Sequence, residues 1–156
     1  MAMRFENEPA DFRFTLISAF DDAIDWDASS VSRDEWLLSD HSQPQKLAFR
    51  EGEQPTEFVC RMMPATRYAE LQAMLPSGAD EIDRAAQVRV QLECFRLALT
   101  EIRNAEGWRP ERWMGRDGLL RREALERGII DPALAQELGY AAFMRQSLSA
   151  RQRKNL

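Results

Sequence analysis

The sequence predicts an α+β fold that is mostly helical, a single domain with a long central helix and a small β-hairpin. Apolar side chains recur at helical spacing over residues 77–107. Two shorter stretches, residues 46–49 and 57–62, flank a run that contains the turn formers Gly52 and Pro55. The 156 residues, of which 44% are hydrophobic, are enough to bury a core without disulfides or a metal.

Residues 1–40 are predicted to form an acidic N-terminal arm, and residues 41–156 a helical α+β domain. The arm contains ten acidic side chains and three arginines, a net charge of −7, whereas the rest of the chain carries +2. Its residues 12–17 alternate in a way that indicates a short strand or an extended segment. Because its charge is high and its apolar residues are few, we expect the arm to be loose in the isolated chain. It would then dock on a partner or on another copy, or else form a solvated acidic surface.

An acidic run in the arm has the pattern DDxxD, formed by Asp21, Asp22 and Asp25. On a helix, such carboxylates could hold magnesium and a diphosphate. Enzymes of that kind need a larger all-helical cavity and a second acidic motif, so we expect a solvated turn or a docking segment. Trp26 and Trp36 lie nearby and are expected to anchor this segment on the core or on a partner.

The hairpin is predicted to pair Lys46–Phe49 with Glu57–Met62 across a loop of about seven residues. Phe58, Cys60 and Met62 would face one side of the second strand. A short helix over residues 66–75 follows, with its apolar side chains at helical spacing and Pro76 at its end.

The long helix is predicted to begin at the N-cap Ser77 and to end near Gly107, which can adopt a left-handed backbone. Two apolar stripes run along it, which indicates a helix covered on two sides. The first stripe comprises Ala85, Val88, Leu92, Phe95, Leu99 and Ile102, and the second Ala86, Val90, Cys94, Leu97 and Ala98.

The segment from Gly107 to Gly118 is predicted to be a linker rich in tryptophan and arginine. Alternating Trp and Arg could stack bases and meet phosphates, form an interface hot spot, or make a loop stabilised by cation–π contacts. The candidate interface residues of the chain are Phe12, Phe14, Trp26, Trp36, Trp108, Arg109, Arg112 and Trp113.

Two helices are predicted after the linker. The first covers residues 119–127 and ends at Gly128, and the last begins at Asp131–Pro132, an N-cap followed by an N1 proline. The chain is basic and free of acidic residues from Arg145 onward, and fraying of this stretch is the simplest expectation.

No arrangement of residues in the sequence predicts catalysis. The only histidine, His41, stands beside Asp40 and Ser42, and adjacent residues do not build a Ser-His-Asp triad. Zinc-binding spacings and glycine-rich phosphate loops are missing, so we expect no metal and no cofactor. Cys60 and Cys94 stand among apolar residues and are expected to be buried thiols in a reducing, cytoplasmic setting. The sequence has no apolar run that could span a membrane and no signal peptide.

Three stretches resemble small tail assembly chaperones of tailed phages and related phage morphogenesis proteins. They are EFVCRMMPATRYAELQAML (57–75), QVRVQLECFRLALTEIRNAEGW (87–108) and LSARQRKNL (148–156). The predicted order of hairpin, short helix, long helix and C-terminal helix is also similar to that group. The resemblance covers residues 57–156 and carries no catalytic motif.

The resemblance implies a non-enzymatic component of tailed-phage particle assembly, either a tail assembly chaperone or a minor virion structural protein. Its partners would be other particle or tail proteins, or copies of itself, in the host cytoplasm during assembly or in the virion. The alternative is a small regulatory nucleic-acid-binding protein that uses the arginine-rich residues 109–127. The net charge of −5 disfavours that alternative, because phosphate binding needs a concentrated positive field.

Overall fold

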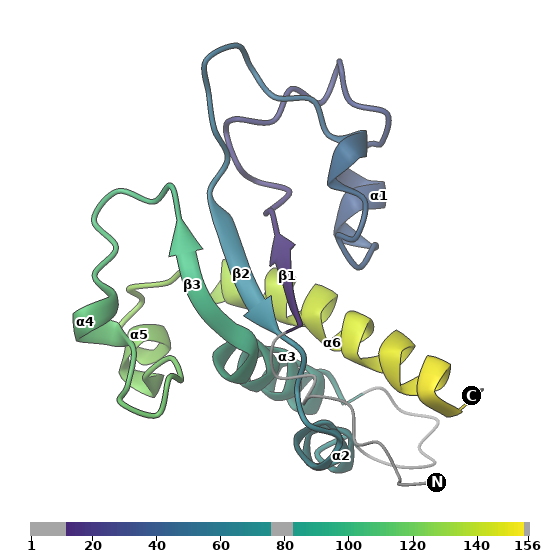
Figure 1. Ribbon diagram of the computed structural model, residues 1–156, viewed down its shortest axis with the longest axis vertical. Coiled ribbons are helices and arrows are strands. Elements are labelled where there is room, and N and C mark those ends of the chain that lie inside the picture. Colours follow the sequence, from purple (N-terminus) through teal and green to yellow (C-terminus); the bar gives the residue numbers. More distant parts are fainter. Residues whose placement is uncertain (1–11, 76–82, 155–156) are drawn as a thin grey trace, which may run out of the picture.

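A three-stranded antiparallel sheet with the strand order β1-β2-β3 lies in the middle of the structure (Figure 1). The computed structural model describes residues 12–75 and 83–154, with side chains as far as residue 147. The strands are β1 (Arg13–Leu16), β2 (Glu57–Arg61) and β3 (Leu99–Arg103). Phe14 of β1 stands opposite Cys60 of β2, and Phe58 of β2 stands opposite Ile102 of β3. The prediction of an α+β single domain is confirmed.

The helices of the described residues connect and cover these strands. They are α1 (Arg33–Leu37), the 3-10 turn η2 (Pro44–Lys46), α2 (Ala65–Ala73), α3 (Arg84–Ala98), α4 (Pro110–Trp113), α5 (Arg122–Glu126) and α6 (Pro132–Lys154). Helices α3 and α6 pack on each other and lie on one side of the sheet (Figure 1). The main core forms between them and the strands.

The main core is built from alternate residues of the strands, from the second stripe of α3 and from Phe95 of its first stripe. Its large, fully enclosed side chains are Leu16, Cys60, Leu71, Val90, Cys94, Phe95, Leu99, Leu120 and Leu138. Each large apolar side chain buried here contributes roughly 1.5–3 kcal/mol. Burial raises the pKa of the Cys60 thiol to about 12 and also raises that of Cys94, so both cysteines behave as apolar core residues.

Helices α3 and α6 approach so closely that one glycine is required at their contact. A Cβ atom built on Gly139 of α6 would lie 1.9 Å from the backbone oxygen of Gln91 in α3. Nothing but hydrogen fits in that space, because real Cβ atoms do not come within 3.0 Å of another heavy atom. The contact explains why a glycine stands in the middle of a helix, where it costs about 1 kcal/mol relative to alanine.

The prediction of one helix over residues 77–107 is wrong after Ala98. Helix α3 begins after the N-cap Asp83, whose side chain accepts a hydrogen bond from the Ala86 amide, and it ends at Ala98. Leu99 has an extended backbone and opens β3 without an intervening loop. The predicted cap Ser77 lies outside the described residues. Pairing with the free edge of β2 outweighs helical propensity here, and the β-branched Thr100 and Ile102 suit a strand.

The predicted hairpin is also wrong in its first strand. Strand β2 forms as expected, but it pairs with β1 and β3, and Phe49 makes only an isolated bridge with Ile24. The turn predicted between the two stretches exists, and Gly52 there has a φ of 76°. The helix predicted over residues 119–127 starts later, at Arg122.

The described part of the predicted arm, residues 12–40, is not a loose segment. It supplies strand β1 and four members of a second core cluster, Ile17, Ala19, Ile24 and Trp36, which Leu47 completes. The indole nitrogen of Trp36 donates a hydrogen bond of 2.9 Å to the Ile17 carbonyl inside this cluster. Its acidic residues lie on turns and exposed positions around these apolar groups, so a high net charge did not exclude a folded segment.

Deletion of residues 1–27 should therefore unfold the protein. The deletion removes β1 and with it Leu16, a fully buried side chain of the main core. We expect the truncated protein to lose its cooperative thermal transition in circular dichroism, whereas deletion of residues 1–11 alone should keep it. A truncation at residue 27 that melts like the full chain would show that β1 is dispensable.

Gly139→Ala should destabilise the protein although alanine is the better helix former. Overpacking at the Gln91 backbone should cost about 1–3 kcal/mol, more than the ~1 kcal/mol that helix propensity returns. Urea denaturation measures the difference, with Tyr140→Ala at the neighbouring exposed position as a control expected to change stability by less than about 1 kcal/mol. A more stable Gly139→Ala variant would contradict the close helix contact.

Candidate functional site

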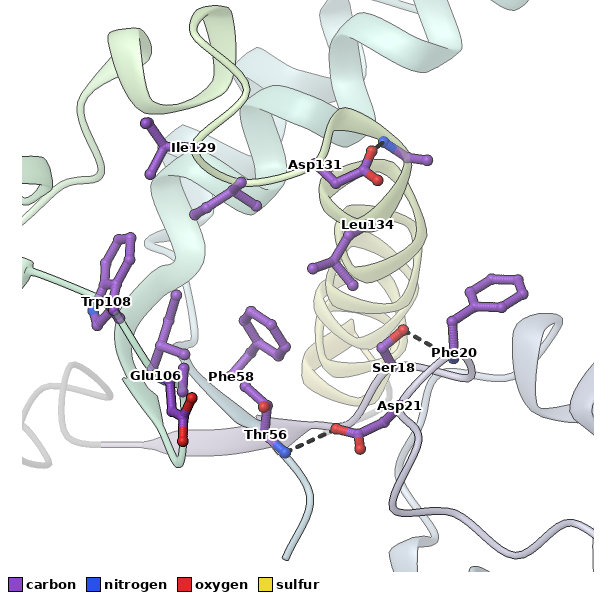
Figure 2. A pocket seen from close by; sticks show the side chains of 15 residues that line it. Ser18, Phe20, Asp21, Thr56, Phe58, Glu106, Trp108, Ile129, Asp131 and Leu134 are labelled. Atoms are coloured by element: carbon purple, nitrogen blue, oxygen red, sulfur yellow. Dashed lines mark hydrogen bonds between the residues drawn. The ribbon is translucent and has the colours of Figure 1, made fainter.

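An open groove of about 600 Å³ lies between the sheet and the start of α6. Figure 2 shows Phe58 of β2, Leu134 of α6 and Trp108 around it. The segment 18–21 and the loop before α6 complete the walls. The lining residues are Ser18, Phe20, Asp21, Thr56, Phe58, Ile102, Ala105, Glu106, Gly107, Trp108, Ile129, Ile130, Asp131, Ala133 and Leu134.

The groove has an apolar floor and an acidic rim. Phe58 and Ile130 are buried at its base, whereas Ile129 at the edge is 45% exposed. The charged residues of the lining are Asp21, Glu106 and Asp131, and none of the lining residues is a lysine or arginine. The groove can therefore enclose an apolar group and attract positive charge beside it.

Two of the three rim carboxylates also hold the backbone in place. Asp21 accepts hydrogen bonds from the amides of Ala23 (2.9 Å) and Thr56 (2.8 Å), which ties the turn of the DDxxD pattern to the residue before β2. Asp131 accepts a 2.9 Å bond from the Ala133 amide and so caps α6, as the sequence predicted. Glu106 has an exposed side chain at the opposite edge.

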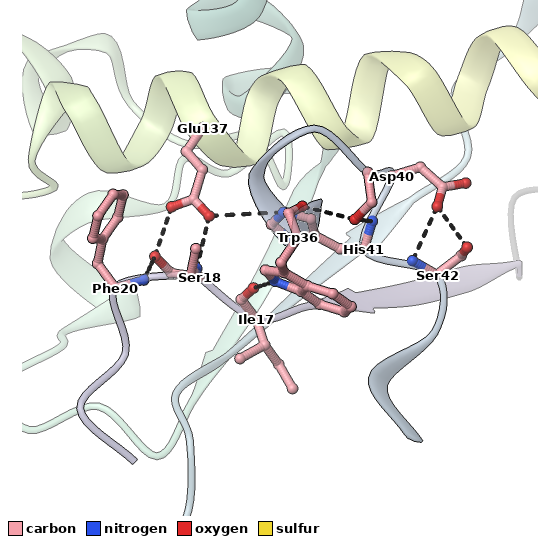
Figure 3. Close-up of polar contacts among 10 residues, drawn as sticks. Ile17, Ser18, Phe20, Trp36, Asp40, His41, Ser42 and Glu137 are labelled. Atoms are coloured by element: carbon pink, nitrogen blue, oxygen red, sulfur yellow. Dashed lines mark hydrogen bonds and ion pairs between the residues drawn. The ribbon is translucent and has the colours of Figure 1, made fainter. Parts of the chain in front are cut away.

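One wall of the groove is fastened to α6 by a nearly buried carboxylate, that of Glu137. Its two oxygens accept hydrogen bonds from the Ser18 hydroxyl (2.6 Å) and from the Ala19 amide (2.8 Å), as Figure 3 shows. The Ser18 hydroxyl in turn accepts a 3.1 Å bond from the Phe20 amide. Burial raises the pKa of Glu137, and the two donors offset part of that rise. The carboxylate thus fixes residues 18–20 on the helix.

His41 lies on the other side of the same carboxylate, completely buried, with a left-handed φ of 57°. Its ring stacks on Trp36 with the centroids 4.7 Å apart, and its Nε2 lies 3.7 Å from the Glu137 Oε2. Burial and the charge of Arg145 lower the pKa of His41 to about 4. The imidazole is therefore neutral at pH 7, and its contact with Glu137 is not an ion pair.

Ser18, Glu137 and His41 do not form a catalytic triad. In a triad the histidine takes the proton of the serine, and the carboxylate orients the histidine. Here Ser18 bonds directly to Glu137, and neither ring nitrogen of His41 has a hydrogen-bond partner. In this cluster Glu137 holds Ser18 and Ala19 against α6, and His41 packs on Trp36.

Within residues 12–75 and 83–154, no group of three or more His, Cys, Asp or Glu side chains is placed to hold a metal ion. None of the helices in that same part of the chain is long and apolar enough to cross a membrane.

The structure divides the predicted interface residues into buried and accessible groups. Phe14, Trp36 and Trp113 are buried within the chain, which corrects their assignment as contact residues. Phe12 is exposed, Trp26 is half-buried, and Arg109 and Arg112 are exposed. Only Trp108 lines the groove. The structure thus does not bring the eight residues together into one surface.

The tryptophan- and arginine-rich segment, predicted as a linker, contains the short helix α4, and two cation–π contacts cover its Trp113. The guanidinium of Arg112 lies 5.2 Å from the centre of the Trp113 ring, and that of Arg127 lies 5.6 Å away. With the ring buried and covered by these two side chains, Trp113 offers no free face for stacking a nucleic-acid base.

Sequence reasoning missed most of the groove, because its walls come from distant parts of the chain. Phe58, Ile102 and Leu134 read as ordinary core positions of three separate elements. The fastening of Ser18 to Glu137 joins residues 119 positions apart and leaves no local pattern. The sequence did contain one signal, because Trp108 directly follows Gly107, a residue that favours turns. The structure places Gly107 at a φ of 78°.

No protein family, curated protein or solved structure matches this chain.

The buried His41 should make stability fall as the pH is lowered from about 6.5 to 4. Its pKa is lower in the folded protein than in the unfolded chain, so the folded state gains stability from the neutral ring above pH 6.5 and loses it as the pH falls toward 4. The loss should be about 3 kcal/mol for this group. His41→Asn, which tolerates a positive φ, should lack this component in urea denaturation at pH 7 and pH 4.5.

Glu137 acts in the opposite sense, because its raised pKa means that protonation favours the folded state as the pH falls. The free energy of unfolding is compared between parent and His41→Asn at each pH. The difference between the two cancels the contributions of Glu137 and of the other carboxyl groups. Equal losses of stability in parent and variant would show that His41 is not buried in its neutral form.

Proposed function

We propose that this protein is a non-enzymatic component of tailed-phage particle assembly that acts by binding other proteins through the groove between the sheet and α6. The single observation that carries the proposal is the groove itself, an apolar hollow of about 600 Å³ whose rim is open to solvent. Interface pockets of this kind receive an apolar anchor of a partner, surrounded by a polar rim.

The construction of the groove supports binding rather than chemistry. Its walls are held by backbone caps and by the Glu137 contacts, so the surface is formed before a partner arrives. Pre-formed surfaces lose less entropy on binding and reach higher affinity for the same contact area. Ser18, Asp21 and Asp131 are used to hold these walls, and Glu106 stands apart from them at the opposite edge.

The assignment to phage assembly is supported by the resemblance of residues 57–156 to tail assembly chaperones and related morphogenesis proteins. The groove lies mostly within this region, since Phe58, Ile102, Trp108 and Leu134 all belong to it. Either role, chaperone or minor virion protein, uses the same kind of contact. Partners are particle or tail proteins, or copies of this chain.

Genetic deletion in the source phage tests the proposal. Removal of the gene should abolish or strongly reduce complete tailed particles in electron micrographs, and a plasmid copy should restore them. Mass spectrometry of purified particles then separates the two roles: presence indicates a virion protein, and absence combined with the deletion defect indicates a chaperone. Normal yield and morphology without the gene, together with absence from particles, would overturn the proposal.

A further inference from the structure

We propose that the groove takes a segment of a partner protein in which a large aliphatic or aromatic side chain stands next to a lysine or arginine. This inference rests on the proposed function, because it names the class of partner for the same groove. It is drawn from the floor, the rim and the openness of the groove.

The floor requires an apolar group. Phe58, Ile102 and Leu134 approach the groove from β2, β3 and α6, and none of the buried side-chain atoms that lack a hydrogen-bond partner in the described residues belongs to a lining residue. Filling the groove removes from water both this floor and the inserted side chain, and each buried apolar Å² contributes roughly 25 cal/mol. A polar side chain in the same place would lose its hydration without a partner.

The rim requires positive charge beside the apolar group. Asp21, Glu106 and Asp131 supply three carboxylates around the opening, and no basic side chain lines it. Arg33 is one nearby cation, with its guanidinium 5.6 Å from the ring centre of Phe20, but it does not line the groove. Complementary charge speeds encounter and fixes register, whereas a phosphate backbone or an acidic peptide would be repelled.

The openness of the groove favours a peptide segment over a small molecule. Small-molecule sites enclose most of the ligand and direct several polar groups at it. Here Ile129 is 45% exposed on the rim, and both oxygens of Asp21 are already bonded to the backbone amides of Ala23 and Thr56. A peptide segment that lies across the rim can place an apolar side chain on the floor and a basic side chain near the negative charge of the rim carboxylates.

Residues 145–154 of the basic stretch lie on α6 and do not reach the groove of their own chain. Helix α6 begins at the groove and runs for 23 residues, which is about 35 Å, away from it. Only the basic stretch of a second copy could enter, and this occupant is an outcome of the test.

Selection from a library of random 12-residue peptides on yeast, against the immobilised full-length chain, tests the inference. Enriched peptides should carry a large apolar residue within three positions of a lysine or arginine. A synthetic representative should bind the parent, and its Kd should rise at least tenfold in Glu106→Lys and in Ile129→Lys. Glu53→Lys and Leu38→Lys are the matched controls, because they make the same changes at exposed positions away from the groove and should leave Kd unchanged.

Three outcomes would overturn the inference: no enrichment, enrichment of acidic peptides, or binding that both groove variants retain. Self-association of the parent that is lost in the groove variants would also overturn it, because the occupant would then be a second copy. Circular dichroism of each variant confirms that the fold is kept. If the inference fails while the gene deletion still blocks particle assembly, only the groove assignment is wrong; if the deletion has no effect, the proposed function fails whatever the peptides do.

Discussion

The carboxylate of Glu137 is the contact on which the position of the N-terminal segment depends. It receives the Ser18 hydroxyl and the Ala19 amide, and it joins two parts of the chain separated by more than a hundred residues. Removing it would leave two buried donors without a partner, at a cost of about 1–3 kcal/mol each. Because residues 18–21 form a wall of the groove, the same contact couples the stability of the N-terminal segment to the shape of the candidate site.

Glu137 can do this only because α6 lies close to both the sheet and α3. The absence of a side chain at Gly139 lets α6 approach the Gln91 backbone, two residues along the helix from the carboxylate. The sheet then receives α3 and α6 on one side (Figure 1). Ser18 and Ala19, which follow β1, bond to Glu137 of α6 (Figure 3). The close packing of α3 and α6 thus positions Glu137, and the Glu137 contacts in turn position one wall of the groove.

The sequence predicted those features that depend on neighbouring residues. The cap at Asp131, the turn at Gly52, the buried cysteines and strand β2 are each set by local chemistry, and the structure confirms them. The end of α3 could not be predicted in the same way, because Leu99 and Ile102 fit the helical stripe as well as a strand. Only the unpaired edge of β2 decides between the two, and that edge is distant in the sequence.

The predicted arm shows a second limit of sequence reasoning. Net charge describes how a segment interacts with water, but it does not describe the few apolar residues that a core can use. Leu16, Ile17 and Trp36 are such residues, and all three are buried although the segment around them is strongly acidic. The groove could not be predicted for a related reason. Its apolar residues look like core residues in the sequence, and they differ only because no other part of the chain covers them.

Native-state hydrogen exchange, read residue by residue, tests the central claim that the segment around β1 is an integral part of the domain fastened by Glu137. The account predicts that the amides of Leu16 and Ala19 exchange as slowly as those in the middle of α6, with the free energy of global unfolding. Fast exchange of these amides, while α3 and α6 remain protected, would show that the segment opens independently and that the groove has no fixed wall.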